Sequence, residues 1–145
     1  MSVETASNRR RAAAVVLLVE DHEASAEGYA QLLTASGYRV LVARNGYEAL
    51  AEISREAPSL VILDLKLPKL DGWELLDRLK ADASVSTIPV VVVTGDSLPS
   101  HHELARSRGA VAVLTKPVQP NDLLDAVRNA LGEAQPQGGA AAPRA

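Results

Sequence analysis

The chain has 145 residues, 47% of them hydrophobic, and a formal net charge of −3. This length suits one domain, and the core must be aliphatic because there are three Tyr, one Trp and no Phe. With no cysteine, disulfides, thiolate metal sites and thiol nucleophiles are excluded. The charge does not favour nucleic acid as a partner, and the basic run 9–11 (RRR) offers too few phosphate contacts to hold DNA at physiological salt.

The N-terminal region imitates a secretory signal peptide. The basic run is followed by apolar residues 12–19 (AAAVVLLV) and by small residues at 24–26 (ASA). The acidic stretch 20–23 (EDHE) interrupts this pattern, and the apolar run is far too short to span a bilayer. We therefore predict a disordered tail at 1–13, a strand after it, and a cytoplasmic protein with no membrane partner.

Five short apolar runs predict five strands. Several runs are continuous rather than alternating, as expected of parallel strands that are buried on both faces. The predicted strands are 15–19, 39–43, 60–63, 89–94 and 111–114.

The segments between these runs follow a helical period. In the first of them Ala26, Tyr29, Ala30 and Leu33 share one face, and Gly37 is predicted to end the helix. The other predicted helices are 46–56, 72–80, 99–108 and 120–131.

One predicted helix and the C-terminal end differ from the rest of the chain. Segment 99–108 (PSHHELARSR) has only Leu104 and Ala105 as apolar residues, so little anchors it. Residues 133–145 (EAQPQGGAAAPRA) show no periodicity and are predicted to form a disordered tail. The folded domain is thus predicted to span 14–132.

Five strands that alternate with five helices predict an α/β domain with a parallel sheet. Right-handed crossovers leave few topologies for such a sheet. At this size the pattern favours the flavodoxin-like, doubly wound strand order 2-1-3-4-5. A site is then expected at the C-terminal ends of the strands, beside the point where the strand order reverses.

Polar residues follow or end four of the five predicted strands. Glu20 and Asp21 follow the first, Asp64 follows the third, Thr94 ends the fourth, and Lys116 follows the fifth. Asp64 alone would fit an ordinary turn residue, because Asp often bonds nearby backbone amides where a strand ends. Turn chemistry does not explain three acids, a hydroxyl and a lysine gathered at one edge.

This grouping makes chemical sense with a bound cation. Three carboxylates within a few ångströms repel one another, and a divalent ion removes that penalty. Oxygen ligands without Cys or suitably spaced His favour Mg²⁺, which keeps waters that phosphate oxygens can replace. A carboxylate, a metal, a lysine and a hydroxyl are together the parts of a phosphoryl-transfer site.

With these motifs the sequence resembles the receiver domain of two-component response regulators, the chemotaxis-regulator-like family. The resemblance covers about residues 15–131. The matching motifs are the acidic pair Glu20-Asp21, DLKLPKLDG at 64–72, TG at 94–95 and KP at 116–117. Each motif is weak alone, but their order and spacing together are specific.

The resemblance implies a phosphoacceptor and a metal site. Asp64 matches the aspartate that takes a phosphoryl group from a histidine kinase. Asp21 and Asp64 match the direct Mg²⁺ ligands, together with the backbone carbonyl of Lys66. Glu20 stands where many members have Asp and is expected to act through a metal-bound water.

The resemblance also implies how the site responds. Thr94 matches the switch hydroxyl that moves toward the phosphoryl group, and Lys116 matches the lysine that pairs with it. Pro117 is expected to follow a cis peptide bond, and Pro68 and Gly72 match the loop that shapes the acceptor's surroundings.

Two features concern signalling rather than the acceptor. Family members often carry Tyr or Phe three residues before the lysine, but Val113 stands there, so the usual aromatic readout is missing. Lys66 and Asp96 each lie two residues after a site residue, and their opposite charges could pair across the mouth of the site and hinder an attacking water.

Other chemistries fit less well. FMN-binding flavodoxins need a hydroxyl- and Gly-rich loop after the first strand, where this chain has 20–25 (EDHEAS). Phosphatases with an aspartate nucleophile need a second acid two residues later, where Lys66 stands. His101 and His102 are adjacent on a predicted helix, so they point in different directions and do not form a metal chelate.

The resemblance implies a protein that signals through its phosphorylation state, with a histidine kinase or phosphotransfer protein as one partner and an unknown downstream protein as another. It implies no enzyme activity beyond the protein's own aspartyl phosphorylation and dephosphorylation. Because no DNA-binding or catalytic element follows in these residues, we expect a stand-alone receiver. The alternatives are a receiver from a larger regulator with an enzymatic or DNA-binding output domain, or a phosphorelay intermediate.

Overall fold

A computed structural model describes residues 14–133. Strands and helices alternate along this part of the chain, as the apolar runs predicted. The elements in order are β1 (Val15–Val19), α2 (Glu23–Ala35), β2 (Arg39–Ala43), α3 (Gly46–Glu56), β3 (Leu60–Leu63), α4 (Gly72–Ala81), β4 (Val90–Thr94), α5 (Pro99–Ser107), β5 (Ala112–Thr115) and α6 (Pro120–Leu131).

The five strands form one parallel sheet in the order β2-β1-β3-β4-β5, which confirms the predicted topology. β1 lies between β2 and β3, so the strand order reverses there. The register aligns the strand ends, because Val19 pairs with both Ala43 and Leu63. The residues that follow β1 and β3 therefore start from neighbouring points on the same edge.

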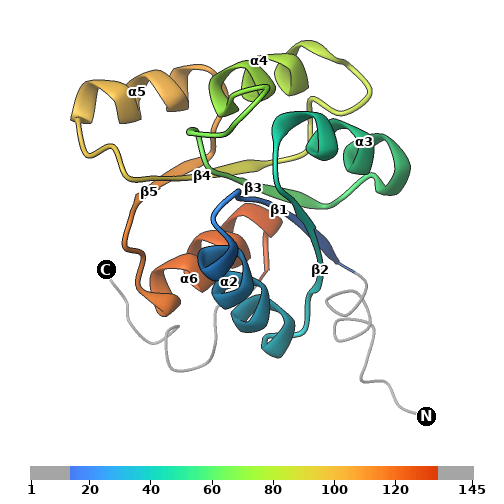
Figure 1. Ribbon diagram of the computed structural model, residues 1–145, viewed down its shortest axis with the longest axis vertical. Coiled ribbons are helices and arrows are strands. Elements are labelled where there is room, and N and C mark those ends of the chain that lie inside the picture. The colour runs from blue at the N-terminus through green and yellow to red at the C-terminus, as the bar shows by residue number, and fades with distance from the viewer. Residues whose placement is uncertain (1–13, 134–145) are drawn as a thin grey trace.

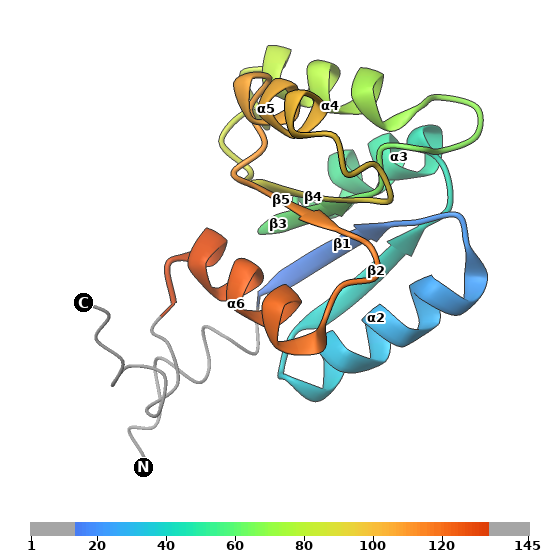
Figure 2. The same cartoon turned by 90° about the vertical axis from the view of Figure 1, so that its left-hand side faces the viewer.

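Helices cover both faces of the sheet, with α3, α4 and α5 on one side and α2 and α6 on the other (Figure 1). Figure 2 shows the same three layers from the side. Alternate strand residues face opposite layers, so Leu17 and Val19 pack under α3 and α4, while Val16 and Leu18 pack under α2 and α6. This two-sided burial explains why β1, β3 and β4 read as continuous apolar runs.

Two strands have boundaries that differ from the sequence prediction by one residue. β4 begins at Val90 rather than at 89, since Pro89 has no N–H and joins the sheet only as an acceptor from the Val61 N–H. β5 spans Ala112–Thr115 rather than 111–114, so it runs up to Lys116. The shift brings the strand end one residue closer to the predicted site.

The helices begin in two ways. His22, Asn45 and Asp71 cap α2, α3 and α4 with side-chain acceptors for backbone N–H groups of the first turn. α5 and α6 instead begin with Pro99 and Pro120 and have no side-chain cap. α5 thus has a less firmly fixed start than the helix before it.

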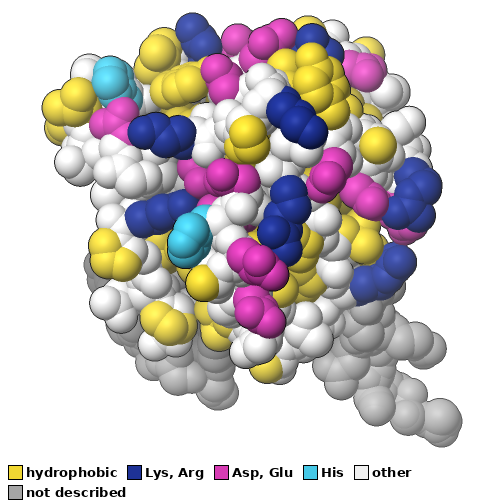
Figure 3. Space-filling model, in the orientation of Figure 1, with side chains coloured by type: hydrophobic (Ala, Val, Ile, Leu, Met, Phe, Trp, Pro, Cys, Tyr) yellow, Lys and Arg dark blue, Asp and Glu magenta, His cyan; other side chains and the backbone are white. Residues whose placement is uncertain are grey.

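The last described residue contacts the residue before β2. Glu133, the first residue of the predicted C-terminal tail, accepts a hydrogen bond of 2.7 Å from the Tyr38 hydroxyl. The rest of that tail and the predicted tail at 1–13 lie outside the described residues. On the face in Figure 3, acidic and basic side chains are interspersed, without a broad patch of one sign.

Candidate functional site

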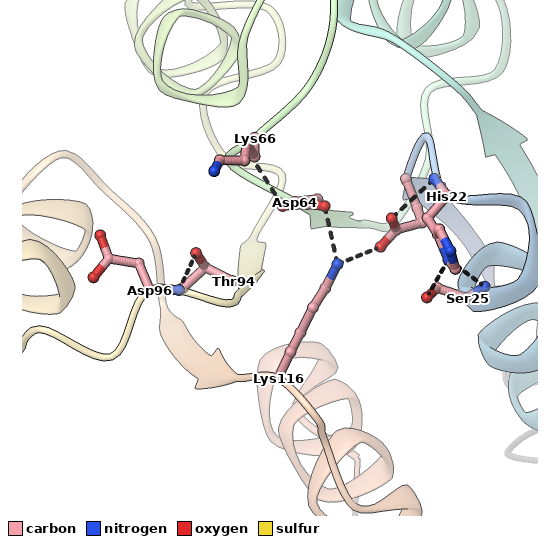
Figure 4. A network of polar contacts seen from close by, with 8 residues as sticks. His22, Ser25, Asp64, Lys66, Thr94, Asp96 and Lys116 are labelled. Atoms are coloured by element: carbon pink, nitrogen blue, oxygen red, sulfur yellow. Dashed lines mark hydrogen bonds and ion pairs between the residues drawn. The ribbon is translucent and has the colours of Figure 1, made fainter.

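The predicted site residues meet at the C-terminal edge of the sheet. Glu20 and Asp64 follow the ends of β1 and β3 and are 2% and 7% exposed, while Lys116 comes from the far end of the chain after β5. Figure 4 shows the Lys116 side chain reaching back across the edge toward Asp64. Residues separated by up to 96 positions are therefore in direct contact.

Lys116 lies between two of the acids. Its Nζ donates hydrogen bonds of 3.0 Å to Glu20 Oε1 and 3.0 Å to Asp64 Oδ2. Partial burial acts to lower the pKa of Lys116, but the hydrogen bonds and charges of Glu20 and Asp64 outweigh it, so the pKa is raised above its ordinary value of 10.5. The ammonium group is therefore charged throughout the physiological pH range and offsets part of the acidic charge.

The backbone fixes Asp64 from both sides. Its N–H donates to the Val19 carbonyl at 3.1 Å, which extends the pairing of β1 and β3 by one residue, and its Oδ1 accepts from the Lys66 N–H at 3.0 Å. Gly72 packs against the same stretch, since a Cβ there would lie 2.5 Å from the Asp64 carbonyl oxygen and 2.4 Å from Leu65 Cα. Only glycine permits this approach, which agrees with the role predicted for position 72.

Three carboxylates converge beside Lys116. Single oxygens of Glu20, Asp21 and Asp64 all lie within 4.8 Å of one another. Asp21 is exposed, whereas the other two are buried, so the cluster is open to solvent on one side. An all-oxygen donor set of this size, partly open to water, fits a hard ion such as Mg²⁺.

Thr94 lies at the same edge with its hydroxyl held inside its own loop. The side chain is buried, and its Oγ1 accepts a hydrogen bond of 3.1 Å from the Asp96 N–H. The Thr94 carbonyl accepts from the Lys116 N–H at 2.8 Å, which ties β4 to the residue after β5. The structure thus brings Thr94 to the site edge with its hydroxyl bonded to residue 96.

The pair that Lys66 and Asp96 could form across the mouth of the site is not present among residues 14–133. Within residues 14–133 the Asp96 carboxylate pairs with His101 and accepts from the Leu98 N–H at 2.9 Å. Lys66 and Asp96 instead line the same open groove of about 760 Å³, together with Trp73. The Lys66 side chain points away from Asp64 in Figure 4.

The two histidines of α5 have a role that the sequence did not reveal. Both contact Asp96: His101 contacts its carboxylate, and His102 Nε2 lies 2.6 Å from its carbonyl oxygen. The signal that could have indicated this is geometric: helix side chains tilt toward the N-terminus, so first-turn residues reach back to the preceding loop.

Tyr29 of α2 is a second residue whose position the sequence did not indicate. Burial raises the pKa of its hydroxyl, the charge of Lys116 opposes that shift, and the charges of Glu20 and Asp64 add to it. A residue predicted only as part of a helix face therefore lies close enough to sense the site's charges.

Two further expectations concern the last strand. The Lys116–Pro117 peptide bond is cis, as predicted. Val113 is half-buried and packs against the core under α3, α4 and α5.

In the part of the chain that the structure describes, every helix is too short or too polar to cross a membrane.

Comparison with known proteins identifies relatives over nearly all of this fold. A model of the family described as the response regulator receiver domain matches residues 16–128. The polar-differentiation response regulator DivK of Brucella anthropi is 34% identical over 119 residues, which are 82% of this chain and 97% of that protein.

Solved structures show the same fold. The signal receiver domain of a signal transduction histidine kinase from Syntrophus aciditrophicus has a TM-score of 0.77 and 34% identity, over 83% of this chain and 91% of that one. The receiver domain of sensor histidine kinase PA1611 from Pseudomonas aeruginosa PAO1 has a TM-score of 0.76 and 25% identity, over 83% and 99%. That structure has a magnesium ion coordinated in its active site cleft.

Proposed function

This chain belongs to the response regulator receiver domain family of two-component signalling, and from that premise we propose that Asp64 accepts a phosphoryl group from a histidine kinase or a phosphotransfer protein. The phosphorylated protein then binds a downstream partner through a changed surface. The proposal rests above all on the contact between Lys116 Nζ and Asp64 Oδ2, because it pairs the acceptor carboxylate with a fixed cation at the strand ends.

The transfer makes one bond and breaks one. An Asp64 carboxylate oxygen forms a bond to phosphorus as the P–N bond of the donor phosphohistidine breaks, and the electron pair stays on the imidazole nitrogen. The Lys66 N–H and the Lys116 ammonium each bind one Asp64 oxygen, so both oxygens are oriented before the donor arrives. This preorganisation supports a nucleophile that needs little rearrangement.

We propose that Asp21, Asp64 and the backbone carbonyl of Lys66 hold Mg²⁺, with Glu20 acting through a bound water. The convergence of the three carboxylates supports this assignment. Bound Mg²⁺ supplies positive charge that stabilises the oxygens of the transferring phosphoryl group.

We propose that Thr94 and Lys116 bind the phosphoryl group on Asp64 and so respond to phosphorylation. The Thr94 hydroxyl has a hydrogen to donate, since its bond with the Asp96 N–H uses only an acceptor lone pair of the oxygen. Movement of this hydroxyl toward a phosphoryl group on Asp64 exchanges a local bond for a charge-assisted one, which is the stronger kind.

The remaining parts of the proposal concern context. We propose a cytoplasmic signalling protein that is no enzyme beyond its own phosphorylation and dephosphorylation, and that has no nucleic-acid or membrane partner. The formal net charge of −3 supports the first of these two exclusions. The downstream protein partner is unknown, and a receiver within a larger regulator or a phosphorelay intermediate would use the same site.

The test is phosphorylation of the purified protein by acetyl phosphate with Mg²⁺, measured by intact mass. Asp64→Asn should abolish labelling because an amide is no nucleophile, while Asp122→Asn, an exposed acid on α6, should label normally. Full labelling of the Asp64 variant would overturn the assignment.

Metal binding is tested separately. Asp21→Asn should greatly weaken Mg²⁺ binding measured by titration calorimetry and leave the fold intact, because it removes a ligand and relieves repulsion. Its thermal melt without Mg²⁺ should hold or rise. Unchanged Mg²⁺ affinity would exclude Asp21 as a ligand.

A further inference from the structure

Two histidines of α5 contact the loop that follows Thr94, and no part of the proposed chemistry uses these contacts. All of these contacts are made by Asp96. The Asp96 N–H donates to Thr94 Oγ1, the Asp96 carbonyl contacts His102, and the Asp96 carboxylate contacts His101. The Thr94 hydroxyl is therefore two hydrogen bonds away from the first turn of α5.

The contact of His102 determines which of its ring nitrogens carries a hydrogen. A carbonyl oxygen only accepts, so the His102 Nε2 that lies 2.6 Å from the Asp96 carbonyl must carry the hydrogen. His102 is partly buried and belongs to the first turn of the helix, where its N–H donates to the Leu98 carbonyl at 3.1 Å. The backbone of His102 is thus fixed within the helix, while its ring binds the loop that precedes the helix.

His101 gives a weaker second contact. Its side chain is 46% exposed and that of Asp96 is 37% exposed, so solvent screens the pair. The same carboxylate accepts from the Leu98 N–H, which closes the loop on itself. The His102 bond is therefore the stronger link between loop and helix.

Apolar packing does little to hold this helix. Ala105 is the one buried residue of α5, and Leu104 is 40% exposed. Polar contacts then decide much of where the helix start and the Thr94 loop lie, because little burial opposes their displacement.

We propose that His102, assisted by His101, is a positioning residue that holds the Thr94 hydroxyl in its resting place, bonded to Asp96, and so opposes its movement toward Asp64. The inference rests on the proposed function, since the moved hydroxyl binds a phosphoryl group on Asp64. A contact made only in the resting arrangement lowers the affinity for any ligand that needs the other arrangement. Removal of the His102 bond should therefore raise that affinity.

The test compares binding of beryllium fluoride with Mg²⁺ to the full chain and its variants. His102→Ala should bind about two- to tenfold more tightly than the wild type, the change that corresponds to one net hydrogen bond. His102→Gln should restore the wild-type affinity, because its Nε2 also donates. His101→Ala should give a smaller gain in affinity than His102→Ala. His101→Asn keeps a donor at the Nδ1 position and should give no gain.

A Thr94→Ala background shows whether the effect passes through the hydroxyl. There, His102→Ala should change the affinity little, whereas a role in general stability would lower affinity in both backgrounds. Equal or weaker binding by His102→Ala, failure of His102→Gln to restore the wild-type value, or an equal gain without the Thr94 hydroxyl would each overturn the inference.

The proposed function fails in a different way. If the wild type binds no beryllium fluoride, or if Asp64→Asn binds it equally, the acceptor assignment is wrong and the inference falls with it. If the wild type binds and the Asp64 variant does not, the outcome with His102→Ala decides the inference alone.

Discussion

α4 and α5 cover the same face of the sheet side by side, yet different forces hold them (Figures 1 and 2). α4 buries Leu75, Leu76 and Leu79 together with Gly72, and its start is capped by Asp71. α5 buries Ala105 and has no side-chain cap. One helix is fixed by apolar burial, while the other depends on polar contacts at its ends.

Those polar contacts lie at both ends of α5. His101 and His102 bind Asp96 at the start. Arg108 follows the last residue of α5. Its guanidinium carbon lies 5.2 Å from the centre of the Trp73 ring, and its Nη1 lies 3.3 Å from Asp77 Oδ2 on α4. Short, partly exposed contacts of this kind are individually weak, so α5 is the element that can shift at low cost.

The difference matters because each helix follows one loop of the site. The loop after Asp64 leads into α4, where burial keeps this proposed acceptor in place. The loop after Thr94 leads into α5, where a displaced hydroxyl can move its surroundings. A phosphorylation switch requires an acceptor that stays in place and a neighbouring segment that can change its conformation.

The largest expected difference is between buried and exposed leucines of the two helices. Leu76→Ala in α4 should destabilise the protein by about 2–5 kcal/mol, because its side chain is fully buried. Leu104→Ala in α5 should change stability by roughly 0.5 kcal/mol or less, as exposed positions do. Urea unfolding measures both, and equal losses would show that α5 is anchored as firmly as α4.

The glycines that lead into the two helices should differ next. Gly72→Ala should cost about 1–3 kcal/mol, because the new Cβ would meet backbone atoms that cannot rotate away. Gly95→Ala has no heavy atom within 4 Å of the added Cβ and should be nearly neutral in the same unfolding measurement. A neutral Gly72 variant would mean that the loop after Asp64 is itself adjustable.

Hydrogen exchange should distinguish the helices when a phosphate mimic binds with Mg²⁺. Amides in 95–108 should change most and those of α4 little. Thr94→Ala should lose much of this change and Val113→Ala should keep it, since no aromatic readout exists at 113. If exchange changed mainly at 39–56, the signal would leave by another face.

A smaller effect is expected at the far end of α5. Arg108→Ala should cost about 0.5–1 kcal/mol, because it removes an exposed ion pair and a cation–π contact. The emission of Trp73, the single tryptophan of the chain, should change as well. Arg106→Ala, which alters an exposed arginine on the same helix, serves as the control and should leave the emission unchanged.

The smallest expected effect is a pH dependence of the contact that starts α5. The Leu98 N–H, followed by His101, lowers the pKa of Asp96 below its ordinary value of 3.8. A lowered carboxyl pKa means that this stabilisation is present above the ordinary value and is lost as pH falls through the lowered one. The unfolding midpoints of wild type and Asp96→Asn should therefore differ above pH 3.8 and converge as the pH falls below that value, and a constant difference would contradict the assignment.

The sequence alone was sufficient for the sheet and for the residues at its edge. Runs such as 15–19 and 60–63 are too short and too uniformly apolar for anything but strands buried on both faces, and right-handed connections limit their order. Once the strands are parallel, Asp64, Thr94 and Lys116 must come to one edge. These results follow from local patterns and general chain geometry.

Only the tertiary structure decided which side chains meet across that edge. Lys116 could have approached any acid, yet it lies between Glu20 and Asp64, and Asp96 pairs with His101 rather than with Lys66. Such choices depend on a few ångströms of loop path and on the direction in which a helix's first-turn side chains point. No residue pattern encodes that path, because it is set by the packing of α4 on the sheet and by the polar contacts at the start of α5.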